Sequence, residues 1–527
     1  MSSGMIKTGC IIMFLIIFAT GCAPGGSSIA NRDKDIEVSS TATIGDLSEI
    51  FAPQAIPVEG YSLIVNLSGT GSSQCPPVIR QYLEQYLLKR LPAKTNVNEI
   101  INSPNTAVVY ISGKIPASAG KGDYFDLKIE ALSGTDTSSL EGGVLLESEL
   151  KAKGQFSVGM TNLAMAEGPV YIDKLRETTP DKRSGLILAG GRTLNDPVIY
   201  LTMKSRNFRL TKQVADRINE RFGPTTAMAI MEGQIKLSIP TKYKKQESKF
   251  YVLVLSTYLF VNAQDKRIPE LITQLTTSEN KSQAETYLES IGINAADKLD
   301  GLLNSENEEV KFRAARCLLN IGRDEGLDTL RTIAYDKNSK YRTEAIEAIS
   351  FGARRNDATA LLQRLLRDED ANSVLAAYNQ LRRLGDSSIT RQVIGKKFYL
   401  DFVPQAAKQY VYATRSGFPT VVLFGSSLYC RVGAFVQTAD SSITINAPEN
   451  LDKVQIIRQI ANAPPIKLEC TYSLIDIIQT LSEASPNPGG RTGLNFPYYD
   501  TIYVLKLMCD KQAILAQFSA GPLAKIE

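Results

Sequence analysis

The chain has 527 residues, 43% hydrophobic and 22% charged, which is enough for about two to four globular domains. Its 59 basic and 55 acidic residues give a formal net charge of +4 without a dense basic run, so nucleic-acid partners are not expected. The complete absence of histidine excludes Ser-His-Asp and Cys-His nucleophile systems and His-containing zinc sites. We therefore expect no catalytic residue, no metal site and no cofactor.

The N-terminal segment has the features of an export signal. Ile11–Ala19 reads IIMFLIIFA, which fits a signal-peptide core and is shorter than the roughly 20 apolar residues of a membrane-spanning helix. The sequence Ala19–Cys22 resembles a bacterial lipobox, in which the cysteine becomes the lipid-modified first residue of the mature protein. We predict a lipoprotein signal peptide over residues 1–21, lipidation of Cys22 and a flexible tether over 22–43. The alternative is an ordinary cleaved signal with an incidental cysteine.

Residues 44–268 have a β-rich texture with scattered helices. Short apolar runs bounded by Gly, Pro and Asn predict strands at residues 61–67, 106–112, 124–129, 144–150, 198–203 and 235–239. One helix is predicted over residues 211–222, where Val214, Ile218 and Phe222 share a face and Gly223-Pro224 ends the element. Strands followed by a helix and a further strand are typical of an α+β fold.

The middle region, residues 269–395, is internally repeated. An Ala, a Leu or Ile and a terminal Gly recur about every 30 residues, first as Ala284, Leu288 and Gly292 and then as Ala314, Leu318 and Gly322. Further copies carry Ala345 with Ile349, and Ala377 with Leu381 and Gly385. Partner helices are predicted over 327–335 and 360–367. Stacked helix pairs of this kind resemble short HEAT-like repeats, and the alternative is an irregular helical bundle.

Residues 396–527 return to a β texture. Strands are predicted at 409–413, 420–424 and 442–446, helices at 473–481 and 501–509, and a loop at 486–493. Similar texture on both sides of the repeats suggests a single domain interrupted by an insertion. The predicted fold class is α+β, with a β-rich body interrupted by an all-α HEAT-like solenoid.

Three motifs with chemical associations have a simpler structural interpretation. Gly69-Thr70-Gly71 lacks the Gly-Lys-Ser/Thr of a phosphate-binding loop, which favours a strand-ending turn. Ser118 and Lys121 have the spacing of a serine–lysine pair but lie between Pro116 and Gly122, which favours a loop. The acidic run 368–370 lacks the alternating ligands and central glycine of a calcium loop, which favours a solvated helix connection.

Seven cysteines are present, of which Cys10 would leave with the signal peptide and Cys22 would be acylated. No CxxC pair occurs. Outside the cytoplasm thiols can pair, although their wide spacing predicts no connectivity. Apart from Cys317 in the repeats, the candidates for disulfide formation are Cys75, Cys430, Cys470 and Cys509.

Several segments, in collinear order, resemble the flagellar P-ring protein family. The opening IGDLSEIFAPQAIPVEGYSLIVNL at 44–67 is similar to that of the mature family members. The further similar segments are IPASAGKGDYFDLKIEAL at 115–132, LEGGVLLESEL at 140–150, AMAEGPVY at 164–171, residues 207–240, AKQYVYATRSGFPTVVLFG at 407–425 and SAGPLAKIE at 519–527.

The resemblance implies a structural subunit of a homo-oligomeric periplasmic ring, with the flagellar rod and other basal-body proteins as partners and heterologous contacts that close by rotation. The lipid anchor and the solenoid depart from that family. They imply attachment to the outer membrane through lipid only, and a curved surface for an envelope protein. Two alternatives stay open: a non-flagellar envelope lipoprotein that reuses the scaffold, and a hydrolase with a carboxylate-only site.

Overall fold

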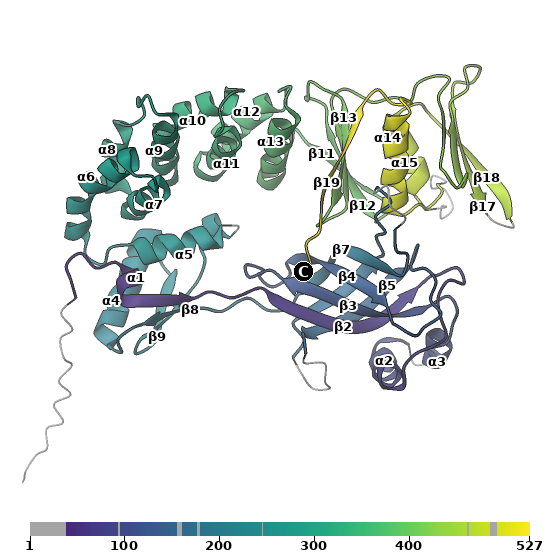
Figure 1. The fold of residues 1–527 in the computed structure, drawn as a ribbon, viewed down its shortest axis with the longest axis horizontal. Helices are drawn as coiled ribbons and strands as arrows, with labels where there is room; N and C mark the ends of the chain where they lie inside the picture. The colour runs from purple at the N-terminus through teal and green to yellow at the C-terminus, as the bar shows by residue number, and fades with distance from the viewer. Residues whose placement is uncertain are drawn as a thin grey trace, which may run out of the picture. The chain divides into compact units, whose positions relative to one another are not determined.

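The computed structural model describes residues 38–526, apart from 93–94, 155–160, 176–179, 245, 461–462 and 485–492 (Figure 1). The predicted signal peptide, Cys22 and most of the tether lie outside the described residues, as does the predicted loop 486–493 apart from its last residue. No described helix combines the length and apolar character needed to cross a membrane.

Six strands of the first region form a closed barrel in the order β2-β3-β4-β7-β6-β5. Their bounds are β2 (Ile56–Val65), β3 (Ala107–Ile115), β4 (Tyr124–Ala131), β5 (Val144–Ala152), β6 (Ala164–Pro169) and β7 (Ser184–Thr193). Alternate side chains such as Val109, Ile111 and Leu127 are buried in one core. Helices α2 (Pro77–Arg90) and α3 (Val97–Ile101) pack on the outside through a second core that includes Leu63 and Val108. The predicted strands of this region are confirmed.

A four-stranded antiparallel sheet has the order β1-β8-β10-β9. It consists of β1 (Ser48–Phe51), β8 (Ile199–Met203), β9 (Ala227–Met231) and β10 (Gln234–Leu237). In the sequence, β1 precedes the barrel strands and the other three strands follow them. The predicted helix is α4 (Phe208–Phe222), which starts three residues earlier because Asn207 caps it by accepting from the Leu210 amide at 3.0 Å. Helices α1 (Ile44–Leu47) and α5 (Glu247–Ser256) and the short η1 (Thr241–Tyr243) complete this part.

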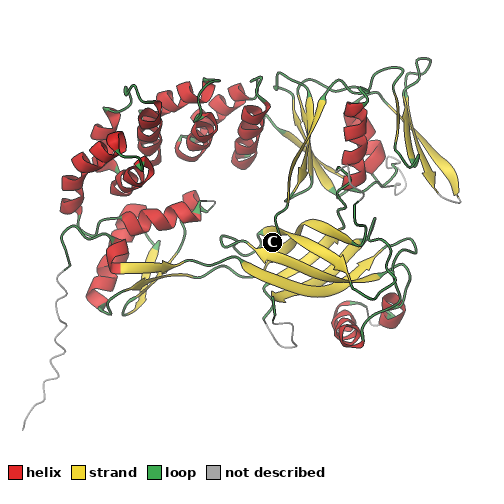
Figure 2. Ribbon diagram, viewed as in Figure 1, coloured by secondary structure: helices red, strands yellow, loops and turns green. Residues whose placement is uncertain are grey.

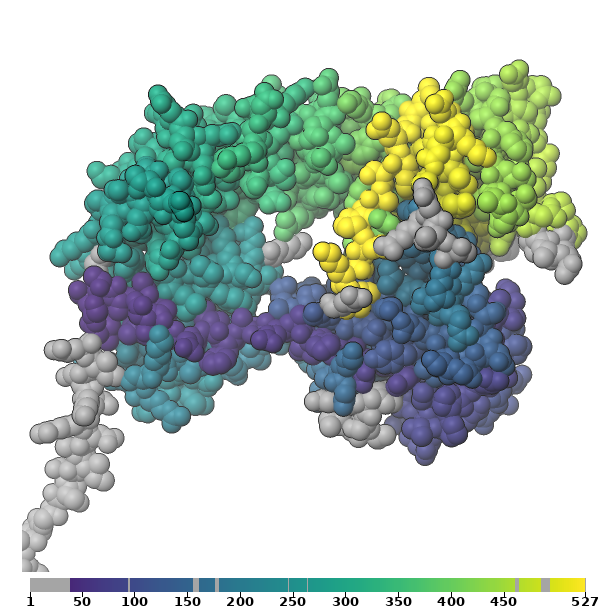
Figure 3. Space-filling view, in the orientation of Figure 1, coloured from purple at the N-terminus to yellow at the C-terminus, as the bar shows by residue number. Residues whose placement is uncertain are grey.

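The repeat region is entirely helical, as Figure 2 shows, and its helices follow one another in pairs. They are α6 (Val261–Thr277), α7 (Lys281–Ile291), η2 (Ile293–Ala295), α8 (Ala296–Asp300), α9 (Glu308–Asn320), α10 (Gly326–Tyr335), α11 (Arg342–Gly352), α12 (Arg355–Leu365) and α13 (Ala371–Leu384). In the space-filling view they form a continuous layer (Figure 3). The four repeated alanines lie in α7, α9, α11 and α13 and are at most 2% exposed.

The repeated glycines end these helices in conformations that disfavour other residues. Gly292, Gly322 and Gly385 follow α7, α9 and α13 with φ of 84°, 90° and 64°. Such angles cost a residue with a Cβ strain that glycine escapes, so the glycine marks the helix end in each copy. The helical repeat predicted from the sequence is confirmed, while its ends differ: α6 begins at Val261, before residue 269, and α13 ends at Leu384.

Replacing Ala345 with leucine is expected to lower the free energy of unfolding by about 1–3 kcal/mol, because the side chain is fully buried and added methylenes must displace neighbouring helices. Chemical denaturation followed by circular dichroism measures this loss. The matched control is Ala360→Leu on α12, where the alanine is exposed and the same change should be nearly neutral. Equal losses in both variants would contradict close packing at the repeated alanine.

The last region contains two sheets. One has the order β11-β12-β14-β13-β19 and the other β15-β16-β17-β18. Their bounds are β11 (Thr390–Ile394), β12 (Phe398–Val403), β13 (Tyr410–Arg415), β14 (Thr420–Phe424), β15 (Phe435–Gln437), β16 (Ile443–Asn446), β17 (Val454–Ile460), β18 (Ala463–Cys470) and β19 (Gln517–Leu523). Helices α14 (Leu474–Ser482) and α15 (Tyr498–Asp510) share one core with both sheets. The predicted strands and helices are confirmed here also.

The α+β class with a β-rich part and a HEAT-like solenoid is confirmed, but no sheet among the described residues combines strands from both sides of the repeats. The two β-rich parts meet instead through side chains. Tyr171 and Leu188 belong to the core of the last region, the Gly142 amide donates to the Tyr499 hydroxyl at 2.9 Å, and Lys174 pairs with Asp500 at 2.7 Å. The two β-rich parts therefore contact each other through side-chain packing, and among the described residues they share no sheet.

Candidate interaction surfaces

A groove of about 270 Å³ runs along the face of the repeats that α5 covers. Its lining comes from α7, α9 and α11, and from α5 together with the residue preceding it, Gln246. Because residues three or four apart share a helix face, Glu285 and Glu289 of α7 both line the groove, as do Glu344 and Glu347 of α11. We refer to this groove as the inner groove.

Glu285 is the centre of the first ion-pair cluster in the inner groove. Its side chain is 5% exposed and accepts from Arg316 at 2.6 and 2.7 Å and from Arg313 at 2.8 Å. Burial lowers the pKa of Arg316, but the hydrogen bonds to Glu285 outweigh it and raise that pKa above its ordinary value. A buried carboxylate needs such partners, so this cluster fastens α7 to α9.

Glu289 is the centre of the second cluster. Lys249 of α5 lies 2.9 Å from its Oε1, and the Asn320 side-chain amide donates to its Oε2 at 3.0 Å. The Lys249 and Lys242 ammonium groups stand 4.9 and 5.0 Å from the centre of the Phe351 ring, within cation–π range. These contacts join α5 and η1, which precede the repeats, to α7 and α11.

At the other end of the repeats, Asp401 of β12 is completely buried and holds α13 to the sheet. It accepts from the Tyr378 hydroxyl at 2.6 Å, and Arg391 of β11 donates to both its oxygens at 2.7 and 2.9 Å. Tyr378 also stacks edge-on against Phe424 of β14, with ring centres 5.4 Å apart. The last helix of the solenoid thus shares a core with one face of this sheet.

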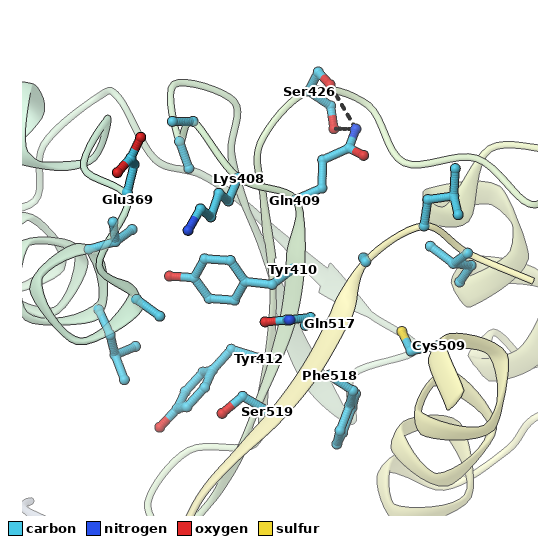
Figure 4. Close-up of a pocket in the computed structure, with 18 of the residues that line it drawn as sticks. Glu369, Lys408, Gln409, Tyr410, Tyr412, Ser426, Cys509, Gln517, Phe518 and Ser519 are labelled. Atoms are coloured by element: carbon cyan, nitrogen blue, oxygen red, sulfur yellow. Dashed lines mark hydrogen bonds between the residues drawn. The ribbon is translucent and has the colours of Figure 1, made fainter. Parts of the chain in front are cut away.

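A larger groove, of about 1170 Å³, lies between α13 and the β13–β19 end of the same sheet (Figure 4). The register pairs Tyr410 with Gln517 and Tyr412 with Ser519, so these four side chains form the floor on one face. Tyr410 stacks on Phe424 with ring centres 4.2 Å apart. β19 is the terminal strand of the sheet and keeps one edge unpaired by any described strand.

The acidic run 368–370 connects α12 to α13, as predicted. Asp370 caps α13 by accepting from the Asn372 and Ser373 amides, and Asp368 pairs with the nearly buried Arg342. For Asp368, burial raises the pKa, but the Asp370 amide and Arg342 together lower it below 3.8. For Asp370, burial likewise raises the pKa and the bonds from Ser373 and Asn372 lower it. The run therefore stabilises a repeat.

Acidification is expected to destabilise this last repeat. Because the folded-state pKa values of Asp368 and Asp370 lie below the ordinary 3.8, their stabilisation is complete above that pH and is lost as the pH falls through the lowered values. Thermal unfolding measured from pH 7 down to pH 2 should show the loss. The Asp368→Asn variant should start less stable and lose less below pH 4; an identical pH profile would contradict the assignment.

The two other motifs behave as the sequence analysis predicts. Gly69 lies in a turn after β2 with φ of 78°, and its amide donates to the Asn105 side chain at 2.9 Å. The Gly71 amide donates to the Pro104 carbonyl at 2.9 Å, so both amides are engaged within the chain and do not form a phosphate cradle. Ser118 and Lys121 lie in the loop between β3 and β4. Among the described residues no group of three or more carboxylates or thiols could hold a metal ion.

Cys75, Cys317, Cys430 and Cys509 carry free thiols. Cys75 is half-buried, and Cys430, Cys470 and Cys509 are buried. Burial raises the pKa of Cys430 to about 11 and that of Cys509 to about 12, which leaves little thiolate for oxidation near neutral pH. Disulfide pairing of the four predicted cysteines stays a prediction, and Cys22 lies outside the described residues.

Comparison with known proteins locates two families along the chain. Residues 43–268 match the family model of the flagellar P-ring protein, and residues 268–350 and 295–382 match the model of HEAT repeats. Both resemblances are thereby confirmed over these residues. The P-ring match ends where the HEAT match begins, so the likeness suggested for 407–425 and 519–527 stays a prediction.

Among curated proteins, the chain is similar to several named flagellar P-ring protein. That of Helicobacter pylori is 27% identical over 237 residues, which are 43% of this chain and 64% of the relative. Those of Rhodopseudomonas palustris and Nitrobacter hamburgensis are 28% and 29% identical over 40% and 39% of this chain, and over 58% and 57% of their own lengths. The chain thus spans less than two thirds of these relatives.

Proposed function

We propose that this chain is a structural subunit of a P-ring-like ring in the flagellar basal body, located in the periplasm around the rod. The observation that carries the proposal is the match of residues 43–268 to the flagellar P-ring protein family. These residues contain the barrel and the four-stranded sheet, and ion pairs such as Lys174–Glu141 hold that fold together. The relatives are named flagellar P-ring protein, and we propose a non-catalytic, structural role for this chain.

The helical repeats extend this role. A solenoid provides a long surface made of similar units, which suits recognition of another protein. We propose that the repeats recruit an envelope protein to the ring, and that neighbouring ring subunits contact each other head to tail. Lipid on Cys22 would tie each subunit to the outer membrane.

Purified basal bodies test the central proposal. A chain labelled at its C-terminus should co-purify with rod and hook structures and appear in a ring around the rod by electron microscopy. A matched strain that lacks the rod should release the chain from this fraction. Recovery of the labelled chain in envelope fractions only, independent of the rod, would overturn the flagellar role.

Lipidation of Cys22 is expected to be detected by mass spectrometry of the mature protein, whose N-terminus should be Cys22 with attached acyl chains. The Cys22→Ser variant should lose the modification and leave the detergent phase, because the acyl chains are the proposed membrane anchor. An unmodified cysteine, or a mature N-terminus at another residue, would contradict this expectation.

A second candidate function is a non-flagellar envelope lipoprotein that uses the ring-protein fold as a support for the repeats. It is favoured by the point at which the P-ring match stops, residue 268, beyond which helical repeats follow. The basal-body experiment separates the two functions, because only the first requires the chain to depend on the rod for its position.

A further inference from the structure

The four-stranded sheet has two open ends. Its order β1-β8-β10-β9 leaves one side of β9 (Figure 1) and one side of β1 without a described strand. Open strand edges pair readily with other chains, and folded proteins usually protect them with charged side chains or proline. The sequence of β9, AMAIM, contains neither, and its Met228, Ile230 and Met231 are 58%, 43% and 56% exposed. We expect an edge of this kind to be covered in the assembled protein.

The side chain of Asn219 covers only the beginning of β9. It accepts from the Ala227 amide at 2.9 Å and donates to the Ala227 carbonyl at 2.8 Å, as a neighbouring strand would. The Ser238 amide donates to the Thr226 carbonyl at 2.8 Å, so Thr226 faces β10. Because the direction of the backbone groups alternates along an antiparallel strand, Ala227 and Ala229 face the open side. Among the described residues Ala227 has a partner there and Ala229 has none.

At the opposite end of the sheet, β1 offers a matching edge. The Lys204 amide donates to the Leu47 carbonyl at 2.8 Å, so by the same alternation Ile50 faces the open side of β1. Phe51, the last residue of β1, is 62% exposed. All neighbours in this sheet are antiparallel, so β9 and β1 run in opposite directions. A second copy of the sheet placed beside β9 therefore presents β1 in the antiparallel orientation.

The register of the sheet determines how the two ends fit together. Two adjacent rows of side chains cross the sheet, one on each face. The row on the buried face consists of Ile50, Leu201, Ile235 and Ala229. The row on the other face consists of Phe51, Tyr200, Lys236 and Met228. Placing Ala229 of one copy opposite Ile50 of the next continues both rows and brings Met228 against Phe51, a favourable contact of sulfur with an aromatic ring.

We propose that β9 of one copy pairs with β1 of the next copy, with Ala229 opposite Ile50 and Met228 opposite Phe51. This contact is head to tail, as a ring requires, whereas β9 against β9 would close a two-fold dimer. Both strands lie within residues 43–268, which match the flagellar P-ring protein family. The inference rests on the proposed ring role and names a surface that joins the subunits.

Disulfide trapping in intact cells tests this pairing with the full chain. The double variant Phe51→Cys/Met228→Cys replaces two exposed side chains, so the fold should be kept. Opposed residues of neighbouring strands have Cα atoms about 4.5–5.5 Å apart, which a disulfide can bridge. Within one copy the two positions are three strand spacings apart, roughly 14 Å, which is too far. We expect a mild oxidant to produce a ladder of linked multimers that reduction removes.

The matched control is Glu49→Cys/Met228→Cys, which moves one thiol by two residues along the same face of β1 and should give little linked product. Each single variant should give no ladder. A linked dimer from Met228→Cys alone would reveal β9 against β9 and overturn the proposal, as would equal ladders from the two double variants. Circular dichroism of the purified variants should match that of the unchanged protein.

Ala229→Pro, added to the trapping variant, supplies a second measurement. Proline is tolerated on an edge strand where the amide faces outward, and it removes the donor that the neighbouring copy would use. The ladder should therefore be lost while the chain stays folded. An unchanged ladder, or no ladder from Phe51→Cys/Met228→Cys, would overturn the proposed pairing. If the chain is nevertheless seen in a ring around the rod, the ring role stands and only this contact is wrong.

Discussion

Replacing Asp401 with alanine is expected to lower the free energy of unfolding by about 3–5 kcal/mol, the range found when one partner of a buried ion pair is removed. Asp401 is fully buried and is the shared acceptor for Tyr378 and Arg391, with Arg382 3.3 Å away. Without it, two guanidinium groups and a hydroxyl lose their acceptor at the contact between α13 and the sheet. Urea denaturation followed by fluorescence and circular dichroism measures the loss.

The Asp401→Asn variant should fall between the original protein and the alanine variant, because the amide oxygen still accepts one hydrogen bond but carries no charge. The control is Asp357→Ala on α12, an exposed aspartate, where a change within about 0.5 kcal/mol is expected. A loss at Asp401 no larger than at Asp357 would show that α13 is held by apolar packing alone.

Deleting the repeats is expected to leave a protein that aggregates. The deletion removes residues 261–386, which hold helices α6 to α13, and leaves β11 in place. If these residues were an insertion on an exposed loop, a short Gly-Ser linker would cost little, because loop closure depends only logarithmically on length. The structure shows the opposite situation: Val403, Val422 and Phe424 are completely buried in a core shared with α13. Uncovering such side chains costs about 1.5–3 kcal/mol each and exposes an apolar sheet face.

Light scattering and binding of a hydrophobic dye measure this exposure. The informative companion carries the same deletion with Val403, Val422 and Phe424 each replaced by threonine, which keeps strand propensity and makes the face polar. It should be more soluble and bind less dye than the plain deletion. A plain deletion that unfolds cooperatively and stays monomeric would show that the repeats are independent of the sheet.

Local patterns in the sequence were sufficient to predict most of the helices and strands and the helical repeat. The buried alanines and the positive-φ glycines of α7, α9 and α13 recur at a spacing that side-chain sterics require, so a reader of the sequence can find them. The start of the solenoid was harder. A proline in a helix usually lies in its first turn, whereas α6 has Pro269 in its interior and begins at Val261.

The pairing of strands could not be predicted from the sequence. Alternating apolar residues show that a strand is half-buried, but they do not show which strand it pairs with. The regions before and after the repeats were expected to share one fold, and the strands instead close into separate sheets. The inner groove could not be predicted from the sequence for a related reason. Glu285, Glu289 and Arg316 are ordinary helix residues in the sequence, and only the stacking of α7 on α9 makes them a buried cluster.

Solenoids usually finish in a polar helix that shields the last repeat from water. Here α5 packs along the first repeats, through Lys249 and Glu289, and β12 contacts the last helix, through Asp401 and Tyr378. The helical stack is thus held by the neighbouring parts of the chain near its first and its last repeat. A pulling force applied between the flanking domains acts on the repeat interfaces in series. The interface with the weakest packing should therefore separate first.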